Sequence, residues 1–444
     1  MSMNYREILD YLNGANEFKA MRLGLENTRI ILNHMGTDIT RVPCIQVAGS
    51  NGKGSTSHFA ASILQASGKK VGLFTSPHLE DIRERIRIDN RLISEQDFVR
   101  SFTAIHDLSE TLLKQELLYS MPTFFEYTFL MAVHYFCLEN VDAAVFEVGL
   151  GGRLDATSAL TPAVSVITGI SKEHTHILGK RVSEIAAEKA GIIKKGVPIV
   201  CGCKTGTAAH RVIQKMASEN GAPFFRVVDS RNRLEIENKG DYYRCVYRTE
   251  ADTYSFEVHL RGTHQAFNAA AAIRAIQCLS HMWRIRPMAK ESIAEGIQHT
   301  FIPARIEVMN TNPNVILDGG HNMESIAALA HFLKEKNLMD LTLIFGVLAD
   351  KNYRKMVDLL LPYTGRVILT QPLSGRALPS SGLRSLFERN SKPVIIKDNI
   401  DDACEQARLL NADILITGSF YLVGAARKVI MHIMQTGGRV SPLT

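Results

Sequence analysis

The sequence has 444 residues, of which 45% are hydrophobic and 22% charged, and its formal net charge is +6. At roughly one domain per 150 residues this length predicts two or three domains, and the composition excludes a disordered chain. A mild basic excess spread over such a length does not indicate a nucleic-acid partner, and it suits small acidic ligands.

The sequence carries no sign of secretion or membrane insertion. The first residues, MSMNYREILDYLNG, are polar and partly acidic, unlike a signal peptide. No apolar run approaches the about 18 residues of a membrane span. The seven cysteines are dispersed without a C-x-x-C pair, which is typical of reduced thiols. We therefore expect a cytoplasmic monomer with small-molecule partners and neither a nucleic acid nor a membrane as partner.

Short apolar runs alternate with amphipathic segments of helix length along most of the chain. Strands are predicted at 44–48, 70–74, 143–148, 163–167, 198–201, 315–317, 341–345, 366–370, 394–396 and 413–417. Strands that alternate with helices indicate parallel, doubly wound sheets. Ligands of such sheets bind at the carboxyl ends of the strands.

Residues 225–262 interrupt this alternation. Period-two patterns over 242–247 and 254–260 predict antiparallel strands that close the first domain. Helices are predicted over about 267–280 and about 290–296, before a link at 299–303. The predicted fold is α/β: a P-loop-containing, doubly wound, mostly parallel domain over 1–298, followed by a smaller Rossmann-like α/β domain over 303–444.

The strongest motif is the glycine-rich loop after the first predicted strand. Its residues are Gly49, Ser50, Asn51, Gly52, Lys53, Gly54, Ser55 and Thr56, and a helix follows at once. Glycines let backbone N–H groups converge on phosphate oxygens, while the helix N-terminus and the lysine add positive charge. A hydroxyl from Ser55 or Thr56 suits a bound Mg²⁺. Only two residues separate Gly49 from Gly52, so the loop is a variant of the usual pattern, which has four.

Candidate magnesium ligands follow other predicted strands. Glu147 ends the strand that precedes a Gly-Leu-Gly-Gly turn, and Ser76 and His174 each come shortly after a strand. Hard oxygen ligands of this kind suit the divalent cation that phosphoryl transfer needs. Taken alone, His174 fits a capping or core histidine, Ser76 a turn residue, and Lys189 a solvated or paired lysine.

Together these segments resemble the folylpolyglutamate synthase and dihydrofolate synthase family of the Mur ligase superfamily. The motifs run in order along nearly the whole chain: GSNGKGST, TSPHLEDIRERIRID, TFFEYTFLMA, EVGLGGRLDAT, AAEKAGIIK, GTHQAFNAAAAI, PARIEV, LDGGHN and GSFYLVGAAR. The resemblance implies an ATP-dependent ligase that adds L-glutamate to a folate or dihydropteroate carboxylate through an acyl phosphate.

The resemblance also implies a role for particular residues. The loop and Lys53 would bind the ATP phosphates, and Asn268, Arg305, Asp318 and His321 match positions that contact the nucleotide or complete the site across the domain cleft. Mg²⁺ would be held by Ser76, Glu147, His174 and Lys189, the last as a carbamate. Arg153 and Asp155 match the loop near the pterin. The first domain would bind ATP and the folate, and the second would close over them and help to hold glutamate.

The sequence departs from the family pattern at several places. The family usually has aspartate at the position of Glu173 and asparagine at that of Ser158. It usually has glycine at Ala304, alanine at Gly320 and proline at Met323. The residues assigned to nucleotide and metal are unchanged. The departures therefore affect the prediction of pterin recognition, near Ser158, more than the prediction of ATP use.

Three alternatives stay open at this point. The chain could be another ligase of the superfamily with a different acid and amino acid, a P-loop regulatory ATPase, or an inactive binding protein. Retention of Lys53, Glu147 and His174 argues against the last of these. The sequence does not distinguish dihydropteroate from a reduced folate as acceptor.

Overall fold

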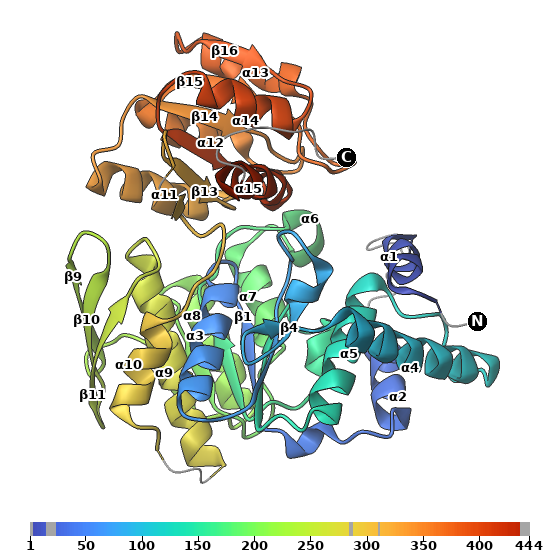
Figure 1. Ribbon diagram of the computed structural model, residues 1–444. Coiled ribbons are helices and arrows are strands. Elements are labelled where there is room, and N and C mark those ends of the chain that lie inside the picture. The colour runs from blue at the N-terminus through green and yellow to red at the C-terminus, as the bar shows by residue number, and fades with distance from the viewer. Residues whose placement is uncertain (1–2, 15–23, 284–286, 310, 436–444) are drawn as a thin grey trace. The chain divides into compact units, whose positions relative to one another are not determined.

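The computed structural model describes residues 3–14, 24–283, 287–309 and 311–435. By its internal contacts the chain forms two compact units. One runs up to His259 and resumes over Gln265–Thr300, and the other comprises Leu260–His264 and the chain from Phe301 onward. Figure 1 shows the elements of both. Among the described residues, no helix has the length and apolarity that crossing a membrane requires.

The N-terminal unit is built on an eight-stranded sheet in the order β4-β3-β2-β5-β1-β6-β7-β8. Its strands are β1 (Cys44–Ala48), β2 (Val71–Phe74), β3 (Ile86–Ile88), β4 (Arg91–Leu92), β5 (Ala143–Glu147), β6 (Val164–Ile167), β7 (Ile199–Cys201) and β8 (Phe224–Arg226). In this sheet order, the neighbouring strands β2, β5, β1, β6, β7 and β8 pair in parallel. Only the pairs β2–β3 and β3–β4 are antiparallel. The predicted doubly wound, mostly parallel sheet is confirmed.

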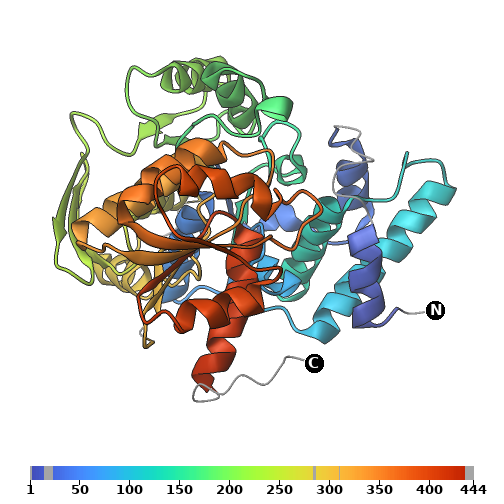
Figure 2. The same ribbon diagram turned by 90° about the horizontal axis from the view of Figure 1, so that it is seen from above.

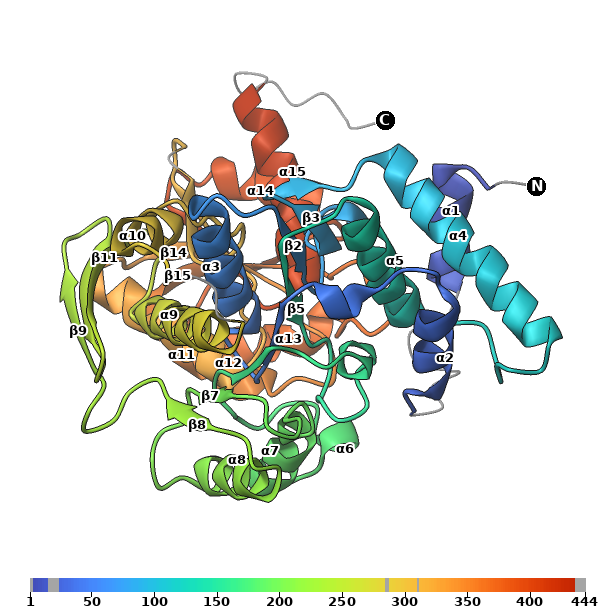
Figure 3. The same cartoon turned by 90° about the horizontal axis from the view of Figure 1, so that it is seen from below.

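Helices cover this sheet on more than one side, as Figure 3 shows. They are α1 (Tyr5–Gly14), α2 (Glu26–His34), α3 (Lys53–Ala66), α4 (Glu95–Lys114), α5 (Phe124–Leu138), α6 (Thr175–Leu178), α7 (Val182–Ala190), α8 (Ala208–Glu219), α9 (His264–Met282) and α10 (Lys290–Gln298). Helix α10 packs on α3, while α4 packs on α5. The core under α4 and α5 is rich in phenylalanine, because α5 is apolar on nearly all sides and is buried accordingly.

A separate three-stranded antiparallel sheet belongs to the same unit. Its strands are β9 (Arg233–Asn238), β10 (Tyr243–Arg248) and β11 (Thr253–Val258), with β10 in the middle. Strand β10 alternates buried and exposed residues, as a half-buried strand does. The sequence pattern predicted β10 and β11 but not β9, which is an edge strand rich in charged residues.

The C-terminal unit has a six-stranded sheet in the order β12-β13-β17-β14-β15-β16. The strands are β12 (Glu307–Met309), β13 (Val315–Asp318), β14 (Leu341–Phe345), β15 (Thr364–Leu369), β16 (Val394–Ile396) and β17 (Ile414–Thr417), and only the β12–β13 pair is antiparallel. The helices are α11 (Met323–Glu335), α12 (Tyr353–Leu360), α13 (Ser380–Glu388), α14 (Ile400–Arg408) and α15 (Phe420–Gln435). Figure 2 shows helices on both faces of this sheet, as predicted for a second α/β domain.

Candidate active site

The glycine-rich loop joins β1 to α3 and lies close to the neighbouring elements. Gly49 has a φ of 149° and Gly52 a φ of 83°. A Cβ at Gly49 would lie 1.9 Å from Thr168 Oγ1, and one at Gly52 would lie 2.3 Å from Asn268 Oδ1. Both positions therefore require glycine. Any other residue would be strained at this positive φ, and its Cβ would overlap atoms of Thr168 or Asn268.

Two contacts fix this loop to the end of β6. The Ser50 N–H donates to the Gly169 carbonyl at 2.7 Å, and Thr168 Oγ1 donates to the Asn51 carbonyl at 2.6 Å. Ser55 and Thr56 are buried in the first turns of α3. The sequence predicted a rigid strand–loop–helix element here, and the structure contains one.

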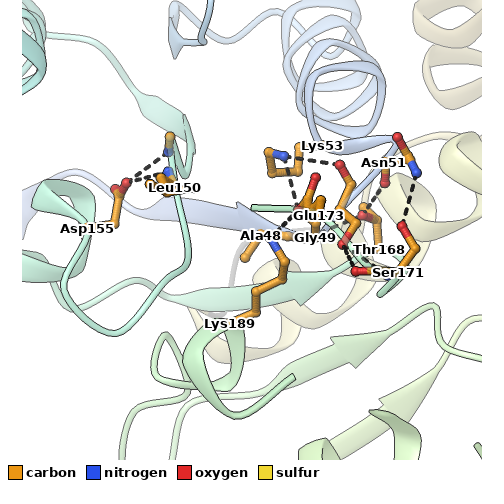
Figure 4. Close-up of polar contacts among 12 residues, drawn as sticks. Ala48, Gly49, Asn51, Lys53, Leu150, Asp155, Thr168, Ser171, Glu173 and Lys189 are labelled. Atoms are coloured by element: carbon orange, nitrogen blue, oxygen red, sulfur yellow. Dashed lines mark hydrogen bonds and ion pairs between the residues drawn. The ribbon is translucent and has the colours of Figure 1, made fainter. Parts of the chain in front are cut away.

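Lys53 is the first residue of α3, and its side chain folds back over the loop. Its Nζ donates to the carbonyls of Gly49 at 3.0 Å and of Ser50 at 3.3 Å (Figure 4). Backbone carbonyls are neutral partners for an ammonium group. An anionic phosphate would be a stronger one, because the attraction between opposite charges then adds to the hydrogen bond.

Lys189 reaches the same loop from α7. Its Nζ donates to the Gly49 carbonyl at 2.8 Å and forms an ion pair of 2.7 Å with Glu173 Oε1. Both side chains are buried, with exposed fractions of 2% and 9%. Figure 4 shows the two residues beside the loop. The paired lysine was one of the two readings that the sequence left open, but nothing in the sequence pointed to Glu173 as its partner.

The charges of this pair follow from their surroundings. Burial and the nearby Lys53 lower the pKa of Lys189 to about 8, although Glu173 opposes the shift. Burial alone would raise the pKa of Glu173, but Lys53 and Lys189 lower it on balance. Glu173 is therefore an anion that faces two lysines, and Lys189 is closer to deprotonation at neutral pH than an exposed lysine.

The candidate metal ligands Glu147 and Ser76 lie side by side. Glu147 is the last residue of β5 and Ser76 follows the neighbouring parallel strand β2, and the Ser76 N–H donates to Glu147 Oε2 at 3.1 Å. Glu147 is buried, and a Cβ on Gly54 would lie 3.4 Å from its Oε2, so the carboxylate is close to the N-terminus of α3. This is a hard oxygen donor beside a phosphate-type loop, which fits Mg²⁺.

His174 immediately precedes the short helix α6, at its N-cap position, and has a φ of 45°. Its ring lies 6.3 Å from that of His176. Over the ranges that the structure describes, no three His, Cys, Asp or Glu side chains converge as a ready-made metal cage. Mg²⁺ commonly takes only one or two carboxylates and completes its shell with water and substrate phosphates, so the residues present fit that ion.

Asp155 organises the Gly-rich turn after β5. Its carboxylate accepts the N–H groups of Gly149, Leu150 and Thr157, and also the Thr157 hydroxyl. Burial raises the pKa of Asp155, while these hydrogen bonds oppose the rise. Arg153 is more exposed and pairs with Glu188 at 3.0 Å. These hydrogen bonds of Asp155 are internal to the turn, and its contact with substrate stays a prediction.

Ser158, where the family usually has asparagine, is 1% exposed. Its hydroxyl donates to the Gly152 carbonyl at 2.6 Å and accepts from Gln46 Nε2 at 3.0 Å. The residue therefore ties the turn to β1 in the interior of the unit. The departure at this position concerns the packing of the turn.

The remaining predicted residues fall in both units. Asn268, on α9 of the N-terminal unit, donates from Nδ2 to Gln265 Oε1 at 3.0 Å and lies against Gly52. In the C-terminal unit Arg305 stacks on the Phe420 ring at 4.7 Å, and Asp318 accepts the N–H groups of Ile306 and Gly320. Burial raises the pKa of Asp318 to about 6, against the effect of Arg305.

His321 lies near the same group. Its Nδ1 is 3.0 Å from the Gly319 carbonyl, and its ring meets that of Phe420 edge-on at 6.2 Å. Phe420 was not among the predicted site residues. The motif GSFYLVGAAR contains it, but an aromatic residue at a helix start carries no signal of its own in a single sequence.

Comparison with known proteins agrees with these features. Residues 47–276 match the Mur ligase middle domain, and residues 304–420 match the Mur ligase glutamate ligase domain. The folylpolyglutamate synthase of Lacticaseibacillus casei is 33% identical over 97% of this chain and 99% of its own length. The dihydrofolate synthase/folylpolyglutamate synthase of Bacillus subtilis is 33% identical over 96% of this chain and 98% of its own length.

A probable bifunctional folylpolyglutamate synthase/dihydropteroate synthase of Haloferax volcanii is 35% identical over 96% of this chain, but the match spans only 50% of that longer protein. Among solved structures, the Mycobacterium tuberculosis folylpolyglutamate synthase complexed with ADP and AMPPCP superimposes with a TM-score of 0.87 at 28% identity, covering 99% of both chains. The chain therefore belongs to the folylpolyglutamate synthase and dihydrofolate synthase family of Mur ligases, a family of ATP-dependent glutamate ligases.

Proposed function

We propose that this protein joins L-glutamate to the carboxylate of a folate or of dihydropteroate, with ATP as co-substrate and Mg²⁺ as cofactor, and that it acts as a cytoplasmic monomer. The observation that carries the proposal is the β1–loop–α3 element with Lys53 at its helix start, in a chain that matches glutamate ligases along nearly its whole length. We assign ATP and the folate to the predicted domain 1–298, and glutamate to the domain 303–444.

The reaction has two steps. The substrate carboxylate attacks the γ-phosphorus of ATP, ADP leaves, and an acyl phosphate forms. The amine of glutamate then attacks the acyl carbon, and phosphate leaves as the amide forms and a proton is lost. Water must be kept away, because it would hydrolyse the acyl phosphate.

The candidate nucleotide and substrate residues of both units would act through position and charge. The loop N–H groups and Lys53 would hold the phosphates, and Lys53 would exchange the Gly49 and Ser50 carbonyls for phosphate oxygens. Asn268, Arg305, Asp318 and His321 would contact the nucleotide, and Arg153 and Asp155 would form the loop beside the pterin. Fixed donors of this kind stabilise developing charge without reorganisation during the reaction.

Ser76, Glu147, His174 and Lys189 would hold magnesium, which when bound neutralises charge on the transferred phosphoryl group. Lys189 would do so as a carbamate, the product of its neutral amine and carbon dioxide. The lowered pKa of Lys189 favours that reaction. A carbamate would bring a second negative charge close to Glu173, and a cation between the two anions would remove that repulsion.

A direct assay tests the proposal. The protein is incubated with ATP, Mg²⁺, glutamate and one acid at a time, which is dihydropteroate, a reduced folate or another carboxylic acid, and the products are analysed by mass spectrometry. The expected product is the acid extended by one glutamate, with one ADP released per amide. Release of ADP without any amide would instead identify a regulatory ATPase, and an amide formed only with other acids would identify a different Mur ligase.

A further inference from the structure

The short turn that carries Arg305 has an unusual backbone. Ala304 has a φ of 57° and Ile306 a φ of 48°. Glycine adopts this region freely, alanine does so at a cost, and a β-branched residue there is a clear outlier. Such conformations persist only where the surrounding contacts hold them, and they gather at functional sites. Arg305 lies between two of them.

Two carboxylates hold the backbone of this turn. Glu307 Oε2 accepts the Ala304 N–H at 2.9 Å, and Asp318 Oδ2 accepts the Ile306 N–H at 3.0 Å. The Ala304 carbonyl in turn accepts the Gly319 N–H at 2.9 Å. Each strained residue therefore has its own N–H bound to a buried anion.

Arg427 of α15 holds the Glu307 carboxylate in place by an ion pair. Arg427 Nε lies 2.9 Å from Glu307 Oε2, and Nη2 lies 3.0 Å from Oε1, which is a bidentate pair. The exposed fractions of the two side chains are only 17% and 8%. A part-buried guanidinium–carboxylate fork of this kind fixes the orientation of both groups.

Helix α15 also contacts the turn at a second point. Phe420 at its start stacks on the Arg305 guanidinium. Phe420 and Arg427 are seven residues apart, about two helical turns, so they lie on the same face of α15. One face of this helix therefore holds the guanidinium of Arg305 at one end and the backbone of its turn, through Glu307, at the other.

We propose that Glu307 and Arg427 are positioning residues for Arg305: the Arg427–Glu307 pair keeps the turn 304–306 in its strained conformation and so holds the Arg305 guanidinium in place for an anionic ligand. This inference rests on the proposed function in one respect only, that the ligand of Arg305 is the nucleotide. Ala304 stands where the family usually has glycine, so this chain depends on the pair more than a chain with glycine there would.

The inference predicts a specific kinetic pattern. Arg427→Met leaves Glu307 without its cation, and the turn relaxes away from positive φ. Apparent affinity falls with the fraction of molecules in the competent conformation, so the KM for ATP rises by about tenfold while kcat changes less. Ala304→Gly, introduced into the Arg427→Met protein, restores most of the loss, because glycine keeps the positive φ without strain.

The matched control is Arg384→Met, which removes an exposed ion pair with Glu388 in the same unit. Its KM for ATP should equal that of the parent. A folded Arg427→Met protein with an unchanged KM would overturn the inference, and so would failure of Ala304→Gly to restore it. If Arg427→Met does not fold, Arg427→Lys replaces it; a lysine keeps the charge without the fork, and an intermediate rise in KM is expected.

A second measurement is independent of ATP. Hydrogen–deuterium exchange of the 304–307 amides should be at least about tenfold faster in Arg427→Met than in the parent or in Arg384→Met, since the Ala304 N–H loses its fixed acceptor. Unchanged exchange would overturn the positioning role. Faster exchange in a protein that lacks ligase activity with every acid would support that role while refuting the proposed function.

Discussion

At the scale of single residues, Lys53 is the most direct test of the phosphate loop. Its Nζ donates to the carbonyls of Gly49 and Ser50, which a phosphate could replace. Lys53→Ala should lower the rate of ligation by at least about a hundredfold, as the loss of one preorganised charge contact does. Circular dichroism should show an intact fold, and Lys114→Ala on the exposed end of α4 serves as the control. Near-normal turnover by Lys53→Ala would refute the loop assignment.

Glu147 and His174 test the magnesium assignment. Glu147→Gln keeps the shape of the side chain but removes its charge, and His174→Ala removes the ring. Both variants should need more Mg²⁺ for half-maximal turnover, and EDTA should abolish ligation by the parent until Mg²⁺ is restored. If the magnesium titrations of both variants coincide with that of the parent, these two residues do not hold the metal.

Lys189 gives a prediction with a defined pH dependence. Carbon dioxide adds to a neutral amine, and the pKa of Lys189 is lowered to about 8. The neutral form is therefore present above about pH 8 and declines as the pH falls, whereas an ordinary lysine has a pKa of about 10.4. After removal of carbon dioxide, bicarbonate should restore activity faster at pH 8 than at pH 6.

Substitution provides the companion test. Lys189→Ala should be nearly inactive, and a short carboxylic acid in solution should partly restore its turnover by replacing the lost anion. Lys189→Glu should retain more activity than Lys189→Ala, although its shorter side chain places the charge differently. A high-resolution density map with a bare ammonium at Lys189, in active protein with nucleotide and magnesium bound, would contradict the carbamate.

At the scale of elements, the packing of α10 on α3 supports the helix that carries the loop. A Cβ at Gly296 would lie 2.6 Å from Ile63 Cα and from the Ser62 carbonyl oxygen. Gly296→Ala should therefore push the helices apart and lower the free energy of unfolding by about 1–3 kcal/mol. At Gly382 of α13 nothing lies within 4 Å of the added Cβ.

A glycine-to-alanine substitution at Gly382 should change the free energy of unfolding in the opposite direction. Gly382→Ala restricts the unfolded chain without a clash, and it should raise the free energy of unfolding by about 0.4–1 kcal/mol. Urea denaturation of both variants measures the contrast. A Gly296→Ala protein as stable as the parent would show that α10 can move away from α3 without cost.

At the scale of the whole molecule, each unit has a hydrophobic core of its own. Leu343 is fully buried in the core of the C-terminal unit, and Leu279 in the N-terminal unit. Leu343→Ala should destabilise its unit by about 2–5 kcal/mol. The single tryptophan, Trp283, belongs to the N-terminal unit, so its fluorescence reports that unit.

Denaturation followed by two probes separates the units. In Leu343→Ala the circular dichroism transition should shift while the Trp283 fluorescence transition moves little. Leu279→Ala is the matched variant and should shift the fluorescence transition. Equal shifts of both signals in Leu343→Ala would mean that the protein unfolds as a single cooperative body.

The sequence by itself determined the local elements. The apolar run 44–48, the glycines after it and the helix pattern from Lys53 are close in the chain, so spacing alone specified β1, its loop and α3. Likewise the strand pattern over 341–345 matched β14, since a fully buried parallel strand reads as a continuous apolar run. Strands β3, β4, β8, β9 and β12 were missed, because short or charged strands lack that run.

Only the tertiary structure decided which distant residues meet. It placed Lys189 on the Gly49 carbonyl across 140 positions and paired it with Glu173. Arg427 met Glu307 across 120 positions in the same way. Such partners are brought together by sheet order and helix packing, and neither is recorded in the spacing of a single chain. A buried charge must find a counter-charge wherever the fold supplies one, and that requirement of desolvation acts on the folded molecule alone.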